Sequence, residues 1–188
     1  LIAISPFIYM AISGQMCYNE LIFLGKAGGT MKAERPYPQV HITQKGERAL
    51  TAGHPWVYAA EVTELSGPVE DGGLADVIGH KGAYLGTGFY NSHSKIRVRL
   101  LSTNANDRFD DAFWQRRVQY AWDYRKAVMP PEDLHCCRVI FGEADGFPGL
   151  TVDRFGPVLV VQVLMKDMFI SLIPRLDGRN IIICIRCL

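Results

Sequence analysis

Short β-rich segments recur at nearly even spacing through residues 38–104, and this pattern constrains the fold more than any other feature. PQVHI at 38–42 is followed by WVYAAEVTEL, LADVIGH, AYLGTGFY and KIRVRLLS, with Gly, Asp, Asn and Ser between them. Strands about ten residues apart are typical of a small barrel or sandwich. Thr43 is placed to cap a short helix through Leu50, which Gly53 ends. The sequence therefore predicts a small β-barrel with one short helix.

A second unit, with a long helix followed by strands, is expected over residues 105–173. The polar linker Asn104–Asp107 precedes DDAFWQRRVQYAWDYRKAVM, which has acidic residues at its start and Arg125 and Lys126 near its end, as a helix dipole favours. CRVIFGE, GLTVDRF and PVLVVQVL then predict three strands, and KDMFISLI the start of a helix. The buried stripe of the long helix is expected at Trp114, Val118 and Ala121. The predicted class is α+β.

Both ends of the chain differ from its middle. Residues 1–30 begin with an apolar run that Ser13 and Gln15 interrupt too early for a membrane span, and we expect a translated leader rather than a domain. Residues 174–188 lose helical periodicity and are expected to form an atypical tail, either an edge strand or the product of a shifted reading frame. The five cysteines, an odd number without framework spacing, favour reduced thiols in the cytoplasm.

The segment GEADGFPGLTVDRFG places three carboxylates, Glu143, Asp145 and Asp153, within a short stretch. Such a group could serve acid–base or metal chemistry if the oxygens converged in a cleft. The neighbouring glycines and Pro148 instead favour a structural hairpin. A metal-dependent enzyme built on this turn is the weakest of three functional hypotheses.

Two other motifs predict no chemistry. Cys184 and Cys187 form a C-x-x-C without a following helix or a second pair of ligands, so neither redox use nor zinc is expected. Gly86 and Gly88 lack the third glycine and the helix of a dinucleotide fingerprint. We therefore expect no metal site.

The segment GFYNSHSKIRVRL suggests nucleic-acid binding. A strand here would place Lys95, Arg97 and Arg99 on one face, next to a polar loop that contains Tyr90, Asn91 and Ser94. Cations beside groups that stack and hydrogen-bond suit RNA, although the net charge of +1 gives no overall signature. The alternative is a solvated strand face paired to Glu61 or Glu64.

KGERALTAGHPWVYAAEV, YLGTGFYNSHSKIRVRLLS and RVIFGEADGFPGLTVDRFGPVLVVQVL together resemble the ribosomal RNA large subunit methyltransferase I family. The resemblance implies a PUA-like RNA-binding barrel at 38–104, a central α+β domain at 105–173 and ribosomal RNA as partner. It also implies a Rossmann-like domain that uses S-adenosylmethionine to methylate cytosine at carbon 5, which we expect to be absent from this chain. The candidate RNA-binding residues are Lys45, Arg48, His54, Tyr90, Asn91, Ser94, Lys95, Arg97 and Arg99.

The departures from the family set the functional expectation. The Gly-rich cofactor loop and the catalytic-cysteine segment have no counterpart, so no catalytic or cofactor-binding residue is assigned and the chain is expected to be inactive alone. The leading hypothesis is the RNA-binding portion of a truncated methyltransferase, and the alternative is a stand-alone RNA-binding module. No membrane partner is expected. The oligomeric state is left open, with a homodimer among the choices.

Overall fold

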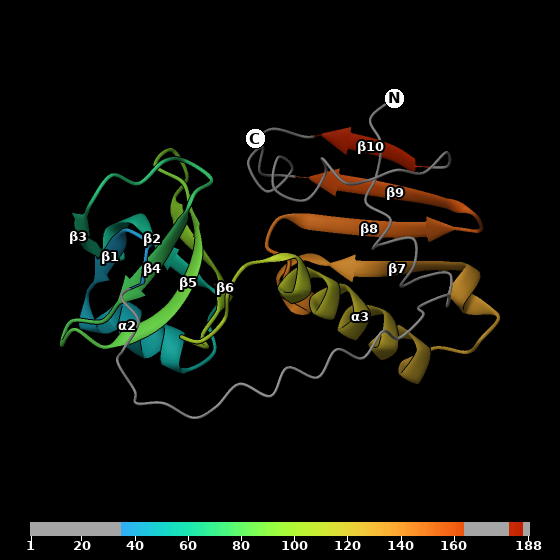
Figure 1. The fold of residues 1–188 in the computed structure, drawn as a ribbon, viewed down its shortest axis with the longest axis horizontal. Helices are drawn as coiled ribbons and strands as arrows, with labels where there is room; N and C mark the ends of the chain where they lie inside the picture. The colour runs from blue at the N-terminus through green and yellow to red at the C-terminus, as the bar shows by residue number, and fades with distance from the viewer. Residues whose placement is uncertain (1–34, 164–180, 186–188) are drawn as a thin grey trace, which may run out of the picture.

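The computed structural model describes residues 35–163 and 181–185. They form two sheets and one long helix (Figure 1). The predicted leader at 1–30 and the helix expected to start in KDMFISLI lie outside the described residues. Among the helices that the structure describes, none is long and apolar enough to cross a membrane.

The first sheet has six strands in the order β2-β6-β5-β4-β1-β3. β1 pairs in parallel with β4, and the other neighbours are antiparallel. The mixed pairing supports the α+β class. The bounds are β1 Gln39–Ile42, β2 Trp56–Tyr58, β3 Val62–Ser66, β4 Leu74–Ile78, β5 Tyr84–Tyr90 and β6 Ile96–Ser102.

The expected strand WVYAAEVTEL is interrupted in its middle. The 3-10 helix η1, Ala59–Glu61, separates β2 from β3, and these two strands form the opposite edges of the sheet. Glu61 is 9% exposed, and its Oε2 accepts from the backbone N of Tyr58 at 2.9 Å. The side chain therefore holds the corner at which the chain changes its pairing partner.

The short helix α2, Gln44–Thr51, confirms the prediction from Thr43. The Thr43 hydroxyl accepts from the backbone N of Gly46 at 3.2 Å, as an N-cap does. Gly53 follows with φ of 92°, a left-handed conformation that glycine adopts at little cost. Local sequence thus determines both ends of this helix.

The second sheet has four strands in the order β10-β9-β8-β7. α3, Asp111–Val128, precedes it and is capped by Asp110, whose Oδ1 accepts from Phe113 N at 2.9 Å. β10 pairs in parallel with β9, so the edge-strand interpretation of the tail holds for residues 181–185. The remaining bounds are η2 Asp133–His135, β7 Cys136–Phe141, η3 Gly142–Asp145, β8 Leu150–Phe155, β9 Val158–Val163 and β10 Ile181–Ile185.

Two hydrophobic cores organise the described residues. The barrel core includes Val40, Val57 and Val98, all fully buried. The second core joins Phe89 of β5 and Leu101 of β6 to side chains of α3 and of the four-stranded sheet. Of the predicted stripe on α3, Val118 and Ala121 are buried and Trp114 packs against the core half-buried. Phe113, Trp122 and Arg125 are the other buried residues of α3.

Candidate nucleic-acid interface

The acidic turn is a structural connection between β7 and β8. Each carboxylate binds an arginine: Glu143 Oε1 accepts from Arg99 Nη1 at 2.8 Å, Asp145 Oδ2 from Arg125 Nη2 at 2.5 Å, and Asp153 Oδ1 from Arg138 Nε at 2.8 Å. No cluster of His, Cys, Asp and Glu within the described ranges could hold a metal ion. The hairpin interpretation is confirmed, and the metal-enzyme hypothesis has no described site.

The loop between β5 and β6 is built by residues that the sequence suggested as RNA contacts. Asn91 Oδ1 accepts from the backbone N of His93 and of Ser94, each at 2.9 Å. Arg97 Nη1 donates to Ser94 O at 3.0 Å and to the carbonyl of Ser92, and Ser94 Oγ accepts from Ile96 N at 3.1 Å. Asn91, Ser94 and Arg97 therefore shape the loop.

Tyr90 occupies a position unsuited to the expected base contact. It lies in the barrel core and is 6% exposed. Its backbone pairs with Val98 at the end of β5. The prediction assigned Tyr90 to the loop, but the strand continues through it and directs its ring into the core.

Arg99 lies on the outer face of β6 beside an aromatic group on the neighbouring strand. Its guanidinium is 5.4 Å from the ring centroid of Trp56, and Trp56 Nε1 donates to Glu143 Oε1 at 3.0 Å. His54 and Tyr58 contact the same indole at centroid distances of 5.6 and 6.4 Å. The partner of Arg99 is thus Glu143 rather than Glu61 or Glu64, and Arg99 links the barrel to the β7–β8 connection.

Two of the predicted cations lie on α2 and remain available. Lys45 and Arg48 are exposed, and within residues 35–163 neither has an ion-pair partner. Arg48 borders a shallow groove of about 360 Å³ that His80 closes from the β4–β5 turn. Lys81, also exposed and without an ion pair in this range, follows His80. We call Lys45, Arg48, His80 and Lys81 the α2–turn surface.

Glu47 holds this surface together. Its Oε2 accepts from the backbone N of His80 at 3.0 Å and also contacts the His80 ring. The hydrogen bond from the His80 side chain lowers the pKa of Glu47 below its ordinary value. Sequence reasoning named neither His80, which ends the predicted strand LADVIGH, nor Lys81, which follows it.

The predicted RNA-binding residues do not form one surface. The β4–β5 turn precedes β5 and the loop with exposed Lys95 follows it, so the α2–turn surface and Lys95 lie at opposite ends of a seven-residue strand. At about 3.3 Å per residue this separation is roughly 20 Å. His54 lies at the start of the aromatic group on β2. Lys45 and Arg48 lie together on α2, and Asn91, Ser94 and Arg97 lie together in the β5–β6 loop.

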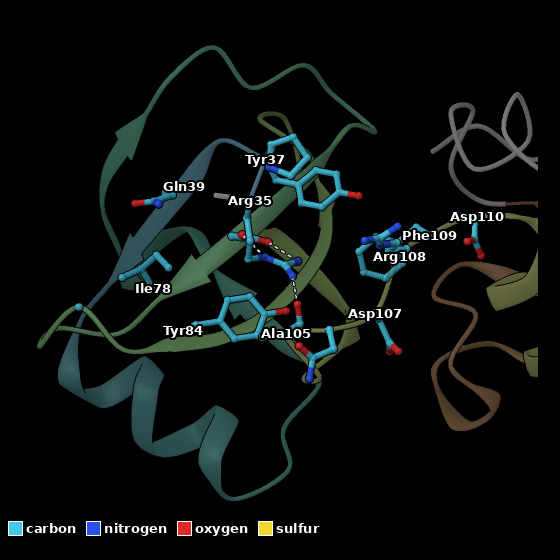
Figure 2. Close-up of a pocket in the computed structure, with 14 residues that line it drawn as sticks. Arg35, Tyr37, Gln39, Ile78, Tyr84, Ala105, Asp107, Arg108, Phe109 and Asp110 are labelled. Carbon is cyan, nitrogen blue, oxygen red and sulfur yellow. Dashed lines mark hydrogen bonds and ion pairs between the residues drawn. The ribbon is translucent and has the colours of Figure 1, made fainter. Parts of the chain in front are cut away.

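A larger pocket of about 1180 Å³ opens on the other side of the β4–β5 turn. Figure 2 shows Arg35 between the rings of Tyr37 and Tyr84, which lie 5.5 and 4.8 Å from its guanidinium carbon. Arg35 donates to Asp76 Oδ2 at 2.7 Å, to Thr87 Oγ1 at 2.8 Å and to the carbonyl of Ala105. The hydrogen bond to Asp76 raises the pKa of Arg35.

Gly86 and Gly88 form no cradle for S-adenosylmethionine, the cofactor that the family resemblance implies. Gly86 and Gly88 are buried against β6: a Cβ on Gly86 would lie 2.8 Å from Ser102 O, and one on Gly88 would lie 2.2 Å from Arg99 O. These glycines permit close strand pairing and offer no backbone to a ligand. In the pocket, Asp76 is 2% exposed and already bound by Arg35 and Thr87.

Comparison with known proteins finds one matching domain model and relatives from one enzyme family. A PUA-like domain model matches residues 40–103. The chain is 35% identical over 128 residues to ribosomal RNA large subunit methyltransferase I of Klebsiella pneumoniae subsp. pneumoniae and 36% identical over 128 residues to that of Salmonella typhi. Each match covers 68% of this chain and 32% of the relative.

Solved structures support the fold. A protein provisionally assigned as a SAM-dependent methyltransferase from Streptococcus mutans superposes with a TM-score of 0.62 at 16% identity, over 79% of this chain and 40% of that one. The chain spans about a third of the length of the curated relatives it matches. Over these matching residues, the sequence comparisons support the ribosomal RNA large subunit methyltransferase I family.

Proposed function

We propose that this chain is the RNA-recognition portion of an S-adenosylmethionine-dependent ribosomal RNA (cytosine-5-)methyltransferase. The similarity to this family and the PUA-like barrel support ribosomal RNA as the partner. The same kinship favours action in the cytoplasm, on large-subunit ribosomal RNA.

The observation that carries the proposal is the α2–turn surface. Lys45, Arg48 and Lys81 are exposed and unpaired within residues 35–163, whereas six of the other eleven lysines and arginines there are paired with carboxylates. RNA phosphates are bound by cations that are not already neutralised, and each phosphate contact releases counterions. This surface can therefore bind an RNA backbone without breaking an existing ion pair.

In this proposal the described residues bind RNA, and methyl transfer is the task of the family's catalytic domain. S-adenosylmethionine supplies the methyl group when bound there. The described residues position the cations that bind RNA. The contact between Glu47 and His80 holds α2 against the β4–β5 turn.

The test compares two double variants in the full chain. K45A/R48A removes two unpaired cations of the α2–turn surface. K126A/R138A removes two cations that are paired to Asp123 and Asp153 in the second unit. Binding to labelled fragments of large-subunit ribosomal RNA is measured by fluorescence anisotropy at several salt concentrations.

The proposal expects K45A/R48A to weaken binding and to reduce the slope of log affinity against log salt by about 1.4 for single-stranded RNA. K126A/R138A should leave that slope close to the wild-type value. Equal effects of the two double variants would reject the surface, and failure of the unmodified chain to bind any fragment would reject RNA recognition itself.

A further inference from the structure

The larger pocket and the α2–turn surface meet at the β4–β5 turn. Gly82 lines the pocket, His80 lines the groove beside α2, and Lys81 lies between them in sequence. A strand of RNA bound across Arg48 and Lys81 would therefore lie beside the edge of the pocket at Gly82. We propose that this pocket receives an unpaired nucleotide of the bound RNA. The inference rests on the proposed function and adds a second site to it.

Three aromatic side chains give the pocket the surfaces that a base needs. Tyr37, Tyr84 and Phe109 line it, and each is half-buried. Tyr37 and Phe109 meet edge to face at a centroid distance of 5.8 Å. Bases in single-stranded RNA stack on such rings whatever their sequence, because every base has a π face.

The wall of the pocket is fixed before any ligand arrives. Arg35 is held by Asp76, Thr87 and the carbonyl of Ala105, and Tyr84 Oη lies 2.8 Å from Thr87 Oγ1. Burial raises the pKa of Tyr84 above its ordinary value. A preorganised wall lowers the entropy cost of binding a flexible strand.

Polar groups at the rim of the pocket have no described partner in the protein. Arg108 is exposed and, within residues 35–163, has no ion-pair partner. Gln39 is exposed as well, and no described hydrogen bond involves its side chain or the Tyr37 hydroxyl. Figure 2 shows Arg108 and Phe109 on the linker that closes the pocket opposite Arg35. Arg108 is thus placed to bind the phosphate of a nucleotide whose base stacks on the aromatic wall.

The experiment places 2-aminopurine at single positions of an unpaired ribosomal RNA oligonucleotide that binds the full chain. Stacking on tyrosine changes the fluorescence of this base. At one position we expect strong quenching, which Tyr37→Leu abolishes while affinity falls about 5- to 150-fold. Tyr120→Leu, which changes a tyrosine 63% exposed on α3, is the matched control and should preserve the quenching.

A second variant keeps the test decisive if Tyr37→Leu fails to fold. Arg108→Ala changes an exposed side chain and should reduce the salt slope by about 0.7. Normal quenching and affinity in both variants would overturn the pocket, while a loss of binding confined to K45A/R48A would preserve the proposed function. Binding of free adenosine monophosphate at the pocket, with RNA unaffected by either variant, would overturn the pocket as an RNA site.

Discussion

Arg35 connects three parts of the chain that are distant in sequence. Its partner Asp76 is 41 positions away, Thr87 is 52 positions away and the Ala105 carbonyl 70. Sequence analysis gave it no role, because local patterns cannot indicate which carboxylate an arginine will meet. Lys45 and Arg48 were named from the family resemblance, and the structure places both exposed on α2. Tyr90 was misplaced because its burial depends on how far β5 extends.

At this scale we predict that Arg35→Ala destabilises the fold by about 2–4 kcal/mol. The substitution leaves Asp76 at 2% exposure without its charged partner. Urea unfolding followed by tryptophan fluorescence measures the free energy of unfolding. Lys126→Ala, which breaks a half-exposed pair, should change it by less than about 1 kcal/mol, and equal losses would contradict the assigned role of Arg35.

The carboxylate of Asp71 anchors the β5–β6 loop by accepting hydrogen bonds from Ser92, and this contact should depend on pH. Hydrogen bonds from the backbone and side chain of Ser92 lower the pKa of Asp71. A depressed pKa means that the anchor stabilises the loop fully above the ordinary carboxyl value of about 3.9 and is lost as pH falls through the folded value. The amide resonance of Ser92, followed from pH 6 to pH 2, should shift over this lower range. Asp71→Asn should remove the transition, and its persistence in the variant would assign it to another group.

At the scale of elements, the β7–β8 connection shows what local sequence can and cannot predict. Gly142, Gly146 and Gly149 have φ of 53°, 73° and 76°, so the glycines that marked a turn do adopt left-handed conformations. The partners of the carboxylates were not predictable, since Arg99 is 44 positions from Glu143 and Arg125 is 20 from Asp145. Turn chemistry is local, whereas ion pairing depends on tertiary structure.

Two aspartates of this hairpin should differ sharply in their contribution to stability. Asp145→Ala leaves Arg125, which is 9% exposed, without a counter-charge, and should cost about 3 kcal/mol. Asp153→Ala removes the partner of Arg138, whose side chain is 46% exposed, and should cost less than about 1 kcal/mol. Thermal unfolding of the two variants provides the comparison. Similar losses would show that burial does not set the strength of these pairs.

Over the whole molecule, the two sheets are separate in pairing but share side chains. The sequence predicted two units from strand spacing and the long helix, and hydrophobic periodicity carries that information. It could not indicate that Phe89 and Leu101 leave the barrel core to pack with Phe113 and Phe147. That arrangement depends on how the linker orients α3, for which the sequence holds no local signal.

The shared core predicts coupled unfolding. Leu101→Ala should cost about 2–5 kcal/mol, because the side chain is 3% exposed, and should lower amide protection in both β5 and β8. Leu100→Ala, which alters a half-buried side chain packed against the barrel core, should lower protection mainly in the six-stranded sheet. Hydrogen exchange read by mass spectrometry separates the two cases. Unchanged protection in β8 after Leu101→Ala would mean that the sheets unfold independently.

The bond from Arg35 to the Ala105 carbonyl also bears on folding kinetics. Closing a loop between residues 70 positions apart costs chain entropy, so we expect this contact to form late in folding. Interactions absent from the transition state govern the rate of unfolding and leave the rate of folding unchanged. We therefore expect the side chain at position 35 to affect how long the barrel stays folded more than how quickly it forms.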